Sequence, residues 1–391
     1  MDERKLYRDS GKENYDEEKD INLYIKLETL SKKFNKIKFI ILTAFLAVIP
    51  LKLFFQYYIF PFLISIEWDN VPSVVFLILS IILAVIINYF FGKVIHWIPY
   101  YLVVNAENSL KAKKQERENF SFKHLNKKEK IIYTLLPDYY FALCYKEYIK
   151  NLNKVCKFHI SGKCITDKDS ICITEWDSIK IKVKYFIHIS NWLNVMISCI
   201  FGIITVLFWG YNGWIIDLGF YILIARVFSR FMEISFAFYK DVVRVDDRVF
   251  TDGSGERYYI HRWRNSLILK SGRISLAIHS LIEVVILYSL VYYSISIYFF
   301  ELNNKELNKL IGFNSEILTY LNFLFTSMAV TVMNFSYTNF PHISWSIGHL
   351  SQVLLSMILI VLSLASYLGL NNSLSERDNN FYNRVQEKSK E

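Results

Sequence analysis

Long apolar segments alternate with charged stretches along most of this chain. Several of them approach or exceed the ~18 residues that cross a bilayer core of about 30 Å as a helix. They lie at about Phe39–Ile66, Val74–Phe91, Trp192–Trp209, Trp214–Phe238, Ile274–Phe300 and Leu350–Gly369. The pattern predicts an all-α polytopic membrane protein with six transmembrane helices.

Basic residues indicate how these helices are oriented. Lys and Arg collect in residues 1–38, 105–185, 240–273 and 371–391, whereas the turns 67–70 and 210–213 contain none. Six spans with both termini inside place every basic stretch in the cytosol, as the positive-inside rule requires. The net charge of +9 then reflects orientation, so we expect a multi-pass protein of the cell membrane, in contact with membrane lipid and without a nucleic-acid partner.

Between the second and third segments, residues 105–185 form a polar, basic insert. Leu136-Pro137-Asp138 breaks its helical spacing, which resumes over Tyr139–Asn151. Ile171–Thr174 and Ile179–Phe186 alternate apolar and polar residues, as paired strands do. We therefore predict a small α+β cytosolic insert.

Four of the five cysteines lie in this insert, where a cytosolic location argues against disulfides. Cys156, His159, Cys164 and Cys172 are residue types that zinc prefers, but their spacing matches no standard zinc finger. We predict no metal site and no cofactor. The chain also has no P-loop, HExxH or nucleophile-elbow motif, so we do not expect an enzyme.

A polar, aromatic break between two apolar runs is the most informative stretch of the chain. Residues 319–370 contain a short apolar run, a break from Thr331 to Pro341, and a long apolar run. Irregular backbone at membrane depth is tolerated only where it lines a cavity or is buried in protein. This order predicts a re-entrant loop between helices five and six.

The break resembles the filter of the pore-loop potassium channel superfamily, in particular its bacterial two-span pore module. That family has an aromatic-rich pore helix, the motif T-x-T-T-V-G-Y-G-D, a proline and an inner helix. Matched residue by residue, the filter-like positions are Thr331, Met333, Asn334, Phe335, Ser336, Tyr337, Thr338 and Asn339, followed by Pro341. The resemblance covers about residues 275–370 and implies a pore for monovalent cations built by a homotetramer.

Both filter glycines are replaced, by Ser336 and Thr338. Glycine adopts left-handed backbone that other residues reach only at a cost of about 1–2 kcal/mol each. A less selective cation pore, a hydroxyl-lined pore and a non-conducting pore fold all remain open. The alternative function is a non-conducting receptor, scaffold or membrane-acting effector whose insert binds a partner.

The expected organisation combines these segments. It comprises a cytosolic tail (1–38), a transmembrane hairpin (39–104), the cytosolic insert (105–185), a second transmembrane hairpin (186–240), a cytosolic basic loop (241–273), a pore-module-like domain (274–370) and a cytosolic polar tail (371–391). Its Lys-, Asn- and Ile-rich usage is typical of an A/T-rich bacterium.

Two sets of polar residues lie within the apolar segments. Gln352, Ser356, Ser363 and Ser366 recur near one face of the last segment, where they could line a pore or hydrogen-bond to other helices. Arg230 and Glu283 lie about 15 Å and 14 Å from the inner ends of their segments, which predicts an ion pair between them. A voltage sensor would need a longer arginine series than Arg226 and Arg230 provide.

Overall fold

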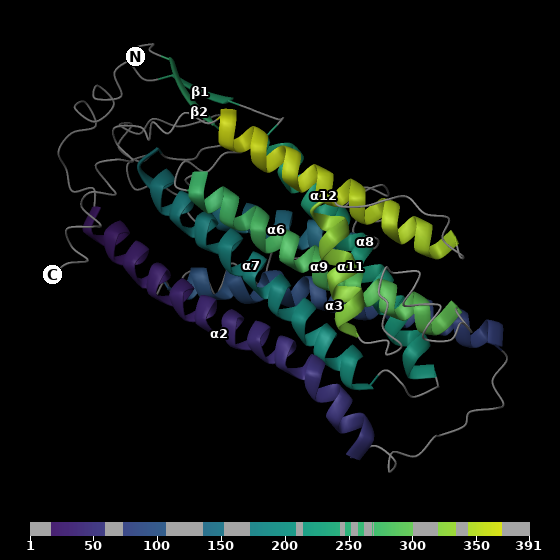
Figure 1. Cartoon of the computed structure of the whole chain (residues 1–391). Coiled ribbons are helices and arrows are strands. Elements are labelled where there is room, and N and C mark those ends of the chain that lie inside the picture. The colour runs from purple at the N-terminus through teal and green to yellow at the C-terminus, as the bar shows by residue number, and fades with distance from the viewer. Residues whose placement is uncertain are drawn as a thin grey trace.

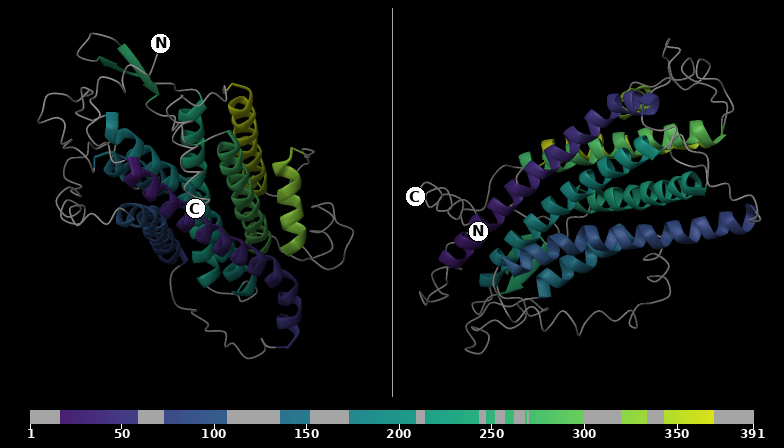
Figure 2. Two further views of the ribbon diagram at one scale, coloured as in Figure 1. Left: turned by 90° about the vertical axis from the view of Figure 1, so that its left-hand side faces the viewer. Right: turned by 90° about the horizontal axis from the view of Figure 1, so that it is seen from below.

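The protein is a bundle of long helices that run side by side, with one short helix between two of them (Figure 1 and Figure 2). The structure, a computed structural model, describes residues 17–58, 73–106, 136–151, 173–208, 214–242, 247–251, 257–261, 268, 270–299, 320–333 and 343–369. The helices are α2 (Glu17–Tyr58), α3 (Ser73–Asn105), α6 (Pro137–Asn151), α7 (Ile173–Phe208), α8 (Trp214–Val242), α9 (Lys270–Phe299), α11 (Tyr320–Thr331) and α12 (Ile343–Gly369).

Four of the described helices are long and apolar enough to cross a membrane. These segments are Leu77–Asn105 in α3, Ile179–Val206 in α7, Ser271–Ser296 in α9 and Ile343–Val361 in α12. On α3 the apolar side chains around Ile78, Ile82 and Ile86 are exposed, as expected of a helix whose solvent is lipid. The chain is a helical protein of the multi-pass membrane type.

The strands predicted for the insert are wrong. The structure has one continuous helix, α7, through Ile173–Phe208, which includes the second predicted strand. Along it Ile181, Tyr185 and Ile189 are buried at intervals of four residues, the spacing of a helix face. No Gly or Pro separates this short alternating run from the apolar segment that follows, so the membrane helix extends back through it. The predicted domain boundary at 185/186 therefore falls inside one helix.

A two-stranded antiparallel hairpin occurs where a basic loop was expected. Strands β1 (Asp247–Thr251) and β2 (Arg257–His261) pair with Val249 opposite Tyr259. Residues 252–256, which join the two strands in the sequence, lie outside the described residues.

The one described helix of the insert, α6, packs into the bundle. It contacts α3, α7 and α8, and its side chains share an aromatic core with the first half of α2 and the end of α3. Tyr100, Phe141 and Tyr145 lie in this core, with the Tyr100 and Tyr145 ring centroids 4.9 Å apart. The helical spacing predicted over Tyr139–Asn151 is confirmed, and α6 begins two residues earlier, at Pro137, whose fixed φ and missing N–H suit the first position of a helix.

At the other end of the bundle, α9 is the central element. It packs against α7, α8, α11 and α12, and its buried residues form the largest hydrophobic core of the described structure. The short helix α11 packs against both α9 and α12, which also pack against each other. This arrangement determines where the polar residues of the last three helices meet.

Candidate functional site

Most of the predicted filter-like residues fall in a segment that the structure does not describe. Thr331 is the last residue of α11 and is buried. Asn334, Ser336, Tyr337, Thr338 and Asn339 lie outside the described residues, as does the 301–319 stretch before α11. The structure therefore places the helices on both sides of the break.

The backbone turns sharply where the break begins. After α11, Met333 has a φ of 62°, in the left-handed region, and its N–H donates to the carbonyl of Val330 at 3.0 Å. A non-glycine residue in this region costs about 1–2 kcal/mol and persists only where the surroundings require it. The strained residue is one of those matched to the potassium-channel filter.

Gln352 on α12 is the polar centre of the last three helices. Its fully buried side-chain nitrogen lies 2.8 Å from each of three acceptors, the carbonyl and hydroxyl of Ser327 and the hydroxyl of Thr331. On its other side, the hydroxyl of Tyr292 on α9 donates to the Gln352 carbonyl oxygen at 2.7 Å. All polar atoms of this side chain are used to bind α11 and α9 to α12.

Further contacts hold α11 against α9. The hydroxyl of Ser327 donates to the carbonyl of Val285 at 2.8 Å, and Ser289 and Tyr320 share a buried hydrogen bond of 2.5 Å. Nearer the start of α12 than Gln352, the Trp345 ring stacks on the Tyr292 ring, with the ring centroids 5.1 Å apart. Helix α11 is thus fixed at both of its ends.

The predicted polar stripe of α12 lies partly inside the chain. Gln352 and Ser356 face α9 and α11, which supports interhelical hydrogen bonding rather than pore lining for Gln352. The hydroxyl of Ser356 is buried without a hydrogen-bond partner among the described residues. Ser363 and Ser366 lie on α12, but their side chains fall outside the described part.

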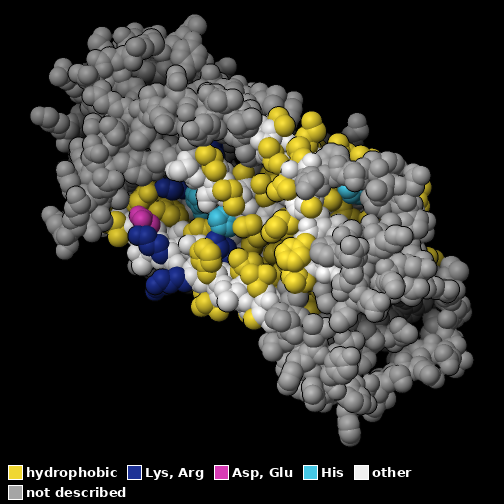
Figure 3. Space-filling model, viewed as in Figure 1, with side chains coloured by type: hydrophobic (Ala, Val, Ile, Leu, Met, Phe, Trp, Pro, Cys, Tyr) yellow, Lys and Arg dark blue, Asp and Glu magenta, His cyan; other side chains and the backbone are white. Residues whose placement is uncertain are grey.

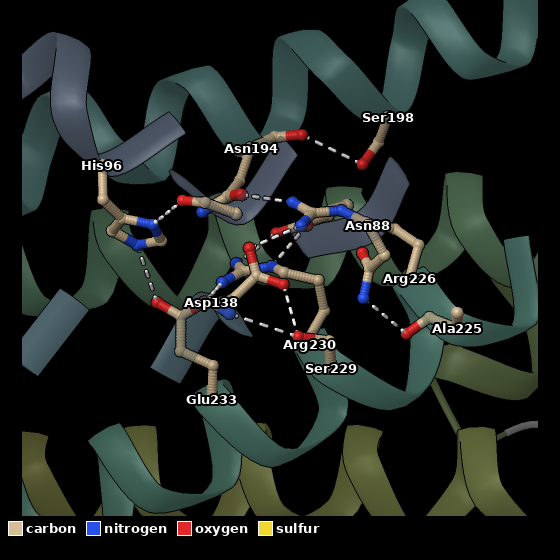
Figure 4. A network of polar contacts seen from close by, with 12 residues as sticks. Asn88, His96, Asp138, Asn194, Ser198, Ala225, Arg226, Ser229, Arg230 and Glu233 are labelled. Carbon is tan, nitrogen blue, oxygen red and sulfur yellow. Dashed lines mark hydrogen bonds and ion pairs between the residues drawn. The ribbon is translucent and has the colours of Figure 1, made fainter. Parts of the chain in front are cut away.

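A second polar centre is a network of charged side chains buried where α3, α6, α7, α8 and α9 meet (Figure 4). Its first ion pair joins Arg230 on α8 to Glu283 on α9. Two parallel hydrogen bonds connect them, Nε to Oε1 at 2.7 Å and Nη2 to Oε2 at 2.6 Å. This bidentate geometry is the strongest that arginine and a carboxylate form. Arg230 also pairs with Glu233 through its Nη1 atom.

Asp138 of α6 forms the next part of the network. Its carboxylate is completely buried and accepts hydrogen bonds of 2.5 Å from both Arg226 and Ser229 on α8. The other terminal nitrogen of Arg226 donates to the side-chain oxygen of Asn194 on α7 at 2.5 Å. A residue in the first turn of α6 thereby anchors that helix to α8 directly and to α7 through Arg226.

A glycine on α3 allows the start of α6 to pack closely against that helix. A Cβ added to Gly92 on α3 would lie 3.1 Å from the Cβ of Pro137 and 3.2 Å from the backbone nitrogen of Asp138. Any larger residue would push the start of α6 away from α3 and displace the carboxylate of Asp138 from its partners on α8. Gly92 is therefore part of the architecture of the network.

His96 of α3 borders the network. Its Nδ1 lies 2.8 Å from the carbonyl of Gly92, and its Nε2 lies 3.4 Å from a carboxylate oxygen of Glu233. The side chain is fully buried, so α3 contributes a polar group beside Glu233 of α8.

The sequence indicated only part of this network. Spacing within the segments pointed to Arg230 and Glu283, whereas Asp138 was interpreted as part of a helix break. The helix-starting Pro-Asp pair was the available signal for Asp138. Nothing in the sequence places His96 beside Glu233, because that contact depends on how α3 and α8 cross.

The described residues contain no group of three His, Cys, Asp or Glu side chains that could hold a metal ion. Cys156, His159, Cys164 and Cys172 lie outside the described part.

No family model, curated protein or solved structure matches the chain.

Proposed function

We propose that the chain is an ion channel-like membrane protein that passes monovalent cations through a pore built by α9, α11 and α12. One observation carries the proposal. A short buried helix, α11, stands between two long apolar helices and ends in a strained left-handed residue at the start of a polar break. A pore loop needs such a supported helix, since its backbone must be held against the strain of an irregular segment.

The proposed topology has six spans, with both termini and the 105–185 insert in the cytosol. Helices α2 and α8 supply the first and fourth spans. Helix α8 carries charged residues, and for this reason it is not among the four helices that are apolar enough to be candidate spans. The pairing of these charges in the buried network supports a position of α8 within the membrane. Intramembrane charges almost always pair with one another inside a bundle.

The proposed pore is closed by further copies of the chain, four in all. The exposed side of α12 carries an apolar stripe in which steps of four and three residues alternate. Its members are Ile343, Ile347, Leu350, Leu354, Met357 and Val361. This is the heptad spacing by which helices pack against each other along a continuous seam. A neighbouring copy of α12 fits the stripe, and one pore loop per chain requires a ring of chains.

Single-channel recording of purified protein in planar bilayers tests the proposal. We expect cation conductance with weak discrimination between K⁺ and Na⁺. Replacing Ser336 and Thr338 together by Gly restores the two glycines of the potassium filter, so the variant should prefer K⁺ more strongly. Ser271→Gly, at an exposed position at the start of α9, is the matched control and should leave selectivity unchanged. Zero conductance from folded, oligomeric protein across several cations would refute a pore.

A non-conducting membrane protein is the second candidate, and the glycine-free break favours it. A receptor or scaffold would use the insert, which α6 ties to the bundle through Asp138, to bind a partner. Light scattering after size-exclusion chromatography separates the two candidates. A monomer or dimer supports the receptor or scaffold, and a tetramer supports the pore.

A further inference from the structure

A buried lysine on α2 has no acidic partner among the residues that the structure describes. The Lys38 side chain is only 3% exposed, and its ammonium lies 2.5 Å from Nε2 of His279 on α9. It also lies 5.4 Å from the centre of the Trp192 ring on α7 and 4.6 Å from that of Phe39. None of these contacts is a carboxylate. Burial lowers the pKa of Lys38 to about 8, so the group still carries its charge at neutral pH.

His279 does not supply the missing negative charge. Its Nδ1 lies 2.5 Å from the carbonyl of Ser275, which can only accept, so Nδ1 carries the proton. Its Nε2 is then a lone-pair acceptor for the Lys38 ammonium. The imidazole is neutral in this arrangement, and the positive charge of Lys38 remains uncompensated.

A second histidine lies near this pair. His188 on α7 is one turn before Trp192, and the two ring centroids are 6.2 Å apart. The His188 ring would be 3.8 Å from a Cβ placed on Gly272 at the start of α9, so it lies at the junction of α7 and α9. Figure 3 shows histidine side chains next to lysine or arginine side chains on this face. We call Lys38, His188 and His279 the basic cluster.

An apolar surface adjoins the basic cluster. Phe39 and Ile40, which follow Lys38, are 55% and 68% exposed, and Ile278 beside His279 is also exposed. Hydrophobic side chains lie next to the basic ones in the same view (Figure 3). The candidate membrane segment of α9 begins at Ser271, and Lys38 immediately precedes the apolar half of α2. The cluster is thus placed where headgroups meet acyl chains.

We propose that the basic cluster binds the phosphate headgroup of an acidic phospholipid, with the acyl chains against Phe39, Ile40 and Ile278. Basic pockets between membrane helices at the cytosolic side suit anionic headgroups. The assignment to the inner leaflet rests on the proposed topology, whereas binding itself does not depend on a pore. The lipid supplies the negative charge that the described surroundings of Lys38 lack.

Lipid-dependent thermal unfolding tests this site. The intact protein is placed in nanodiscs of phosphatidylcholine with increasing phosphatidylglycerol, and the midpoint of unfolding is followed by tryptophan fluorescence. We expect the midpoint to rise with the anionic lipid. Lys38→Gln should weaken the apparent affinity by about fivefold, as expected for one cation near an anionic surface. Lys38→Arg keeps the charge and should retain the response, which separates charge from folding.

Lys32→Gln is the matched control on the same helix. Lys32 is 73% exposed and already paired with Glu28 at 3.0 Å, so its loss should change the lipid response by less than twofold. An equal loss in both Gln variants would overturn the site, because it would show only general attraction to the membrane. Inorganic phosphate that raises the midpoint as much as the lipid would overturn the phospholipid assignment. A normal lipid response in protein that does not conduct would refute the pore and leave this site standing.

Discussion

The Arg230–Glu283 pair allows the sharpest test of the buried network. Arg230→Gln removes both bonds to Glu283 and the contact with Glu233, and it leaves two buried carboxylates without that cation. Removing one partner of a buried ion pair costs about 3–5 kcal/mol, and we expect this range for Arg230→Gln. Glu283→Gln should cost less, about 2 kcal/mol, because Arg230 keeps Glu233 and the amide oxygen can still accept one hydrogen bond.

The double variant separates pairing from general damage. With both groups neutral, neither member of this pair is left as a buried charge without its partner, so at least about 2 kcal/mol of the single-variant costs should be recovered. The free energy of unfolding is measured by SDS titration in mixed micelles. The exposed pair Glu28 and Lys32 provides a control cycle, for which about 0.3–0.5 kcal/mol of coupling is expected.

A coupling energy for Arg230 and Glu283 as small as that of the control pair would refute the reasoning. Additive losses would mean that each side chain is stabilised by its own surroundings and that their contact contributes nothing.

Three further predictions follow from the packing of the bundle. Gly202→Ala should destabilise the protein by about 1–3 kcal/mol, because the new Cβ would lie 2.3 Å from the Phe45 ring; Gly219→Ala, with nothing within 4 Å, is the control and should be neutral or stabilising in thermal unfolding. Gln352→Leu should lower the unfolding free energy by about 1–3 kcal/mol, because it leaves buried hydroxyls unpaired. An unchanged unfolding free energy would contradict the role of Gln352 in joining α9 and α11 to α12. Burial raises the pKa of the Cys144 thiol to about 11. The rate of Cys144 alkylation, measured by peptide mass spectrometry, should therefore rise about tenfold per pH unit from pH 7 to 10. A rate that reaches a plateau below pH 9 would contradict the raised pKa.

Apolar segments and helix punctuation could be predicted from the sequence because they depend on local residues. The helical spacing over Tyr139–Asn151 is confirmed by α6, and the apolar segment Val74–Phe91 is confirmed as part of α3. The strand at Ile179–Phe186 is wrong because short alternating runs fit two periodicities, and only the neighbouring helix decides between them. Tertiary packing selected the helix.

The polar centres show a similar division. The depths of Arg230 and Glu283 could be estimated from their segments, and the structure places the two side chains in contact. Asp138 and Gln352 acquire their roles from helix crossings that no local pattern encodes. Their partners lie 88 and 60 residues away, at Arg226 and Tyr292. The sequence offered a polar stripe on α12, but not the direction in which it faces.

The charged residues of α8 have a consequence for how the protein enters the membrane during synthesis. Each buried charge at the centre of a bilayer costs about 2.5–3.5 kcal/mol on insertion scales. When α8 leaves the ribosome, Asp138 has already been made and can meet Arg226, but Glu283 has not. Under the proposed topology, Arg230 has only Glu233 of its own helix as a partner until α9 is made, and we expect α8 and α9 to leave the translocon together as a pair.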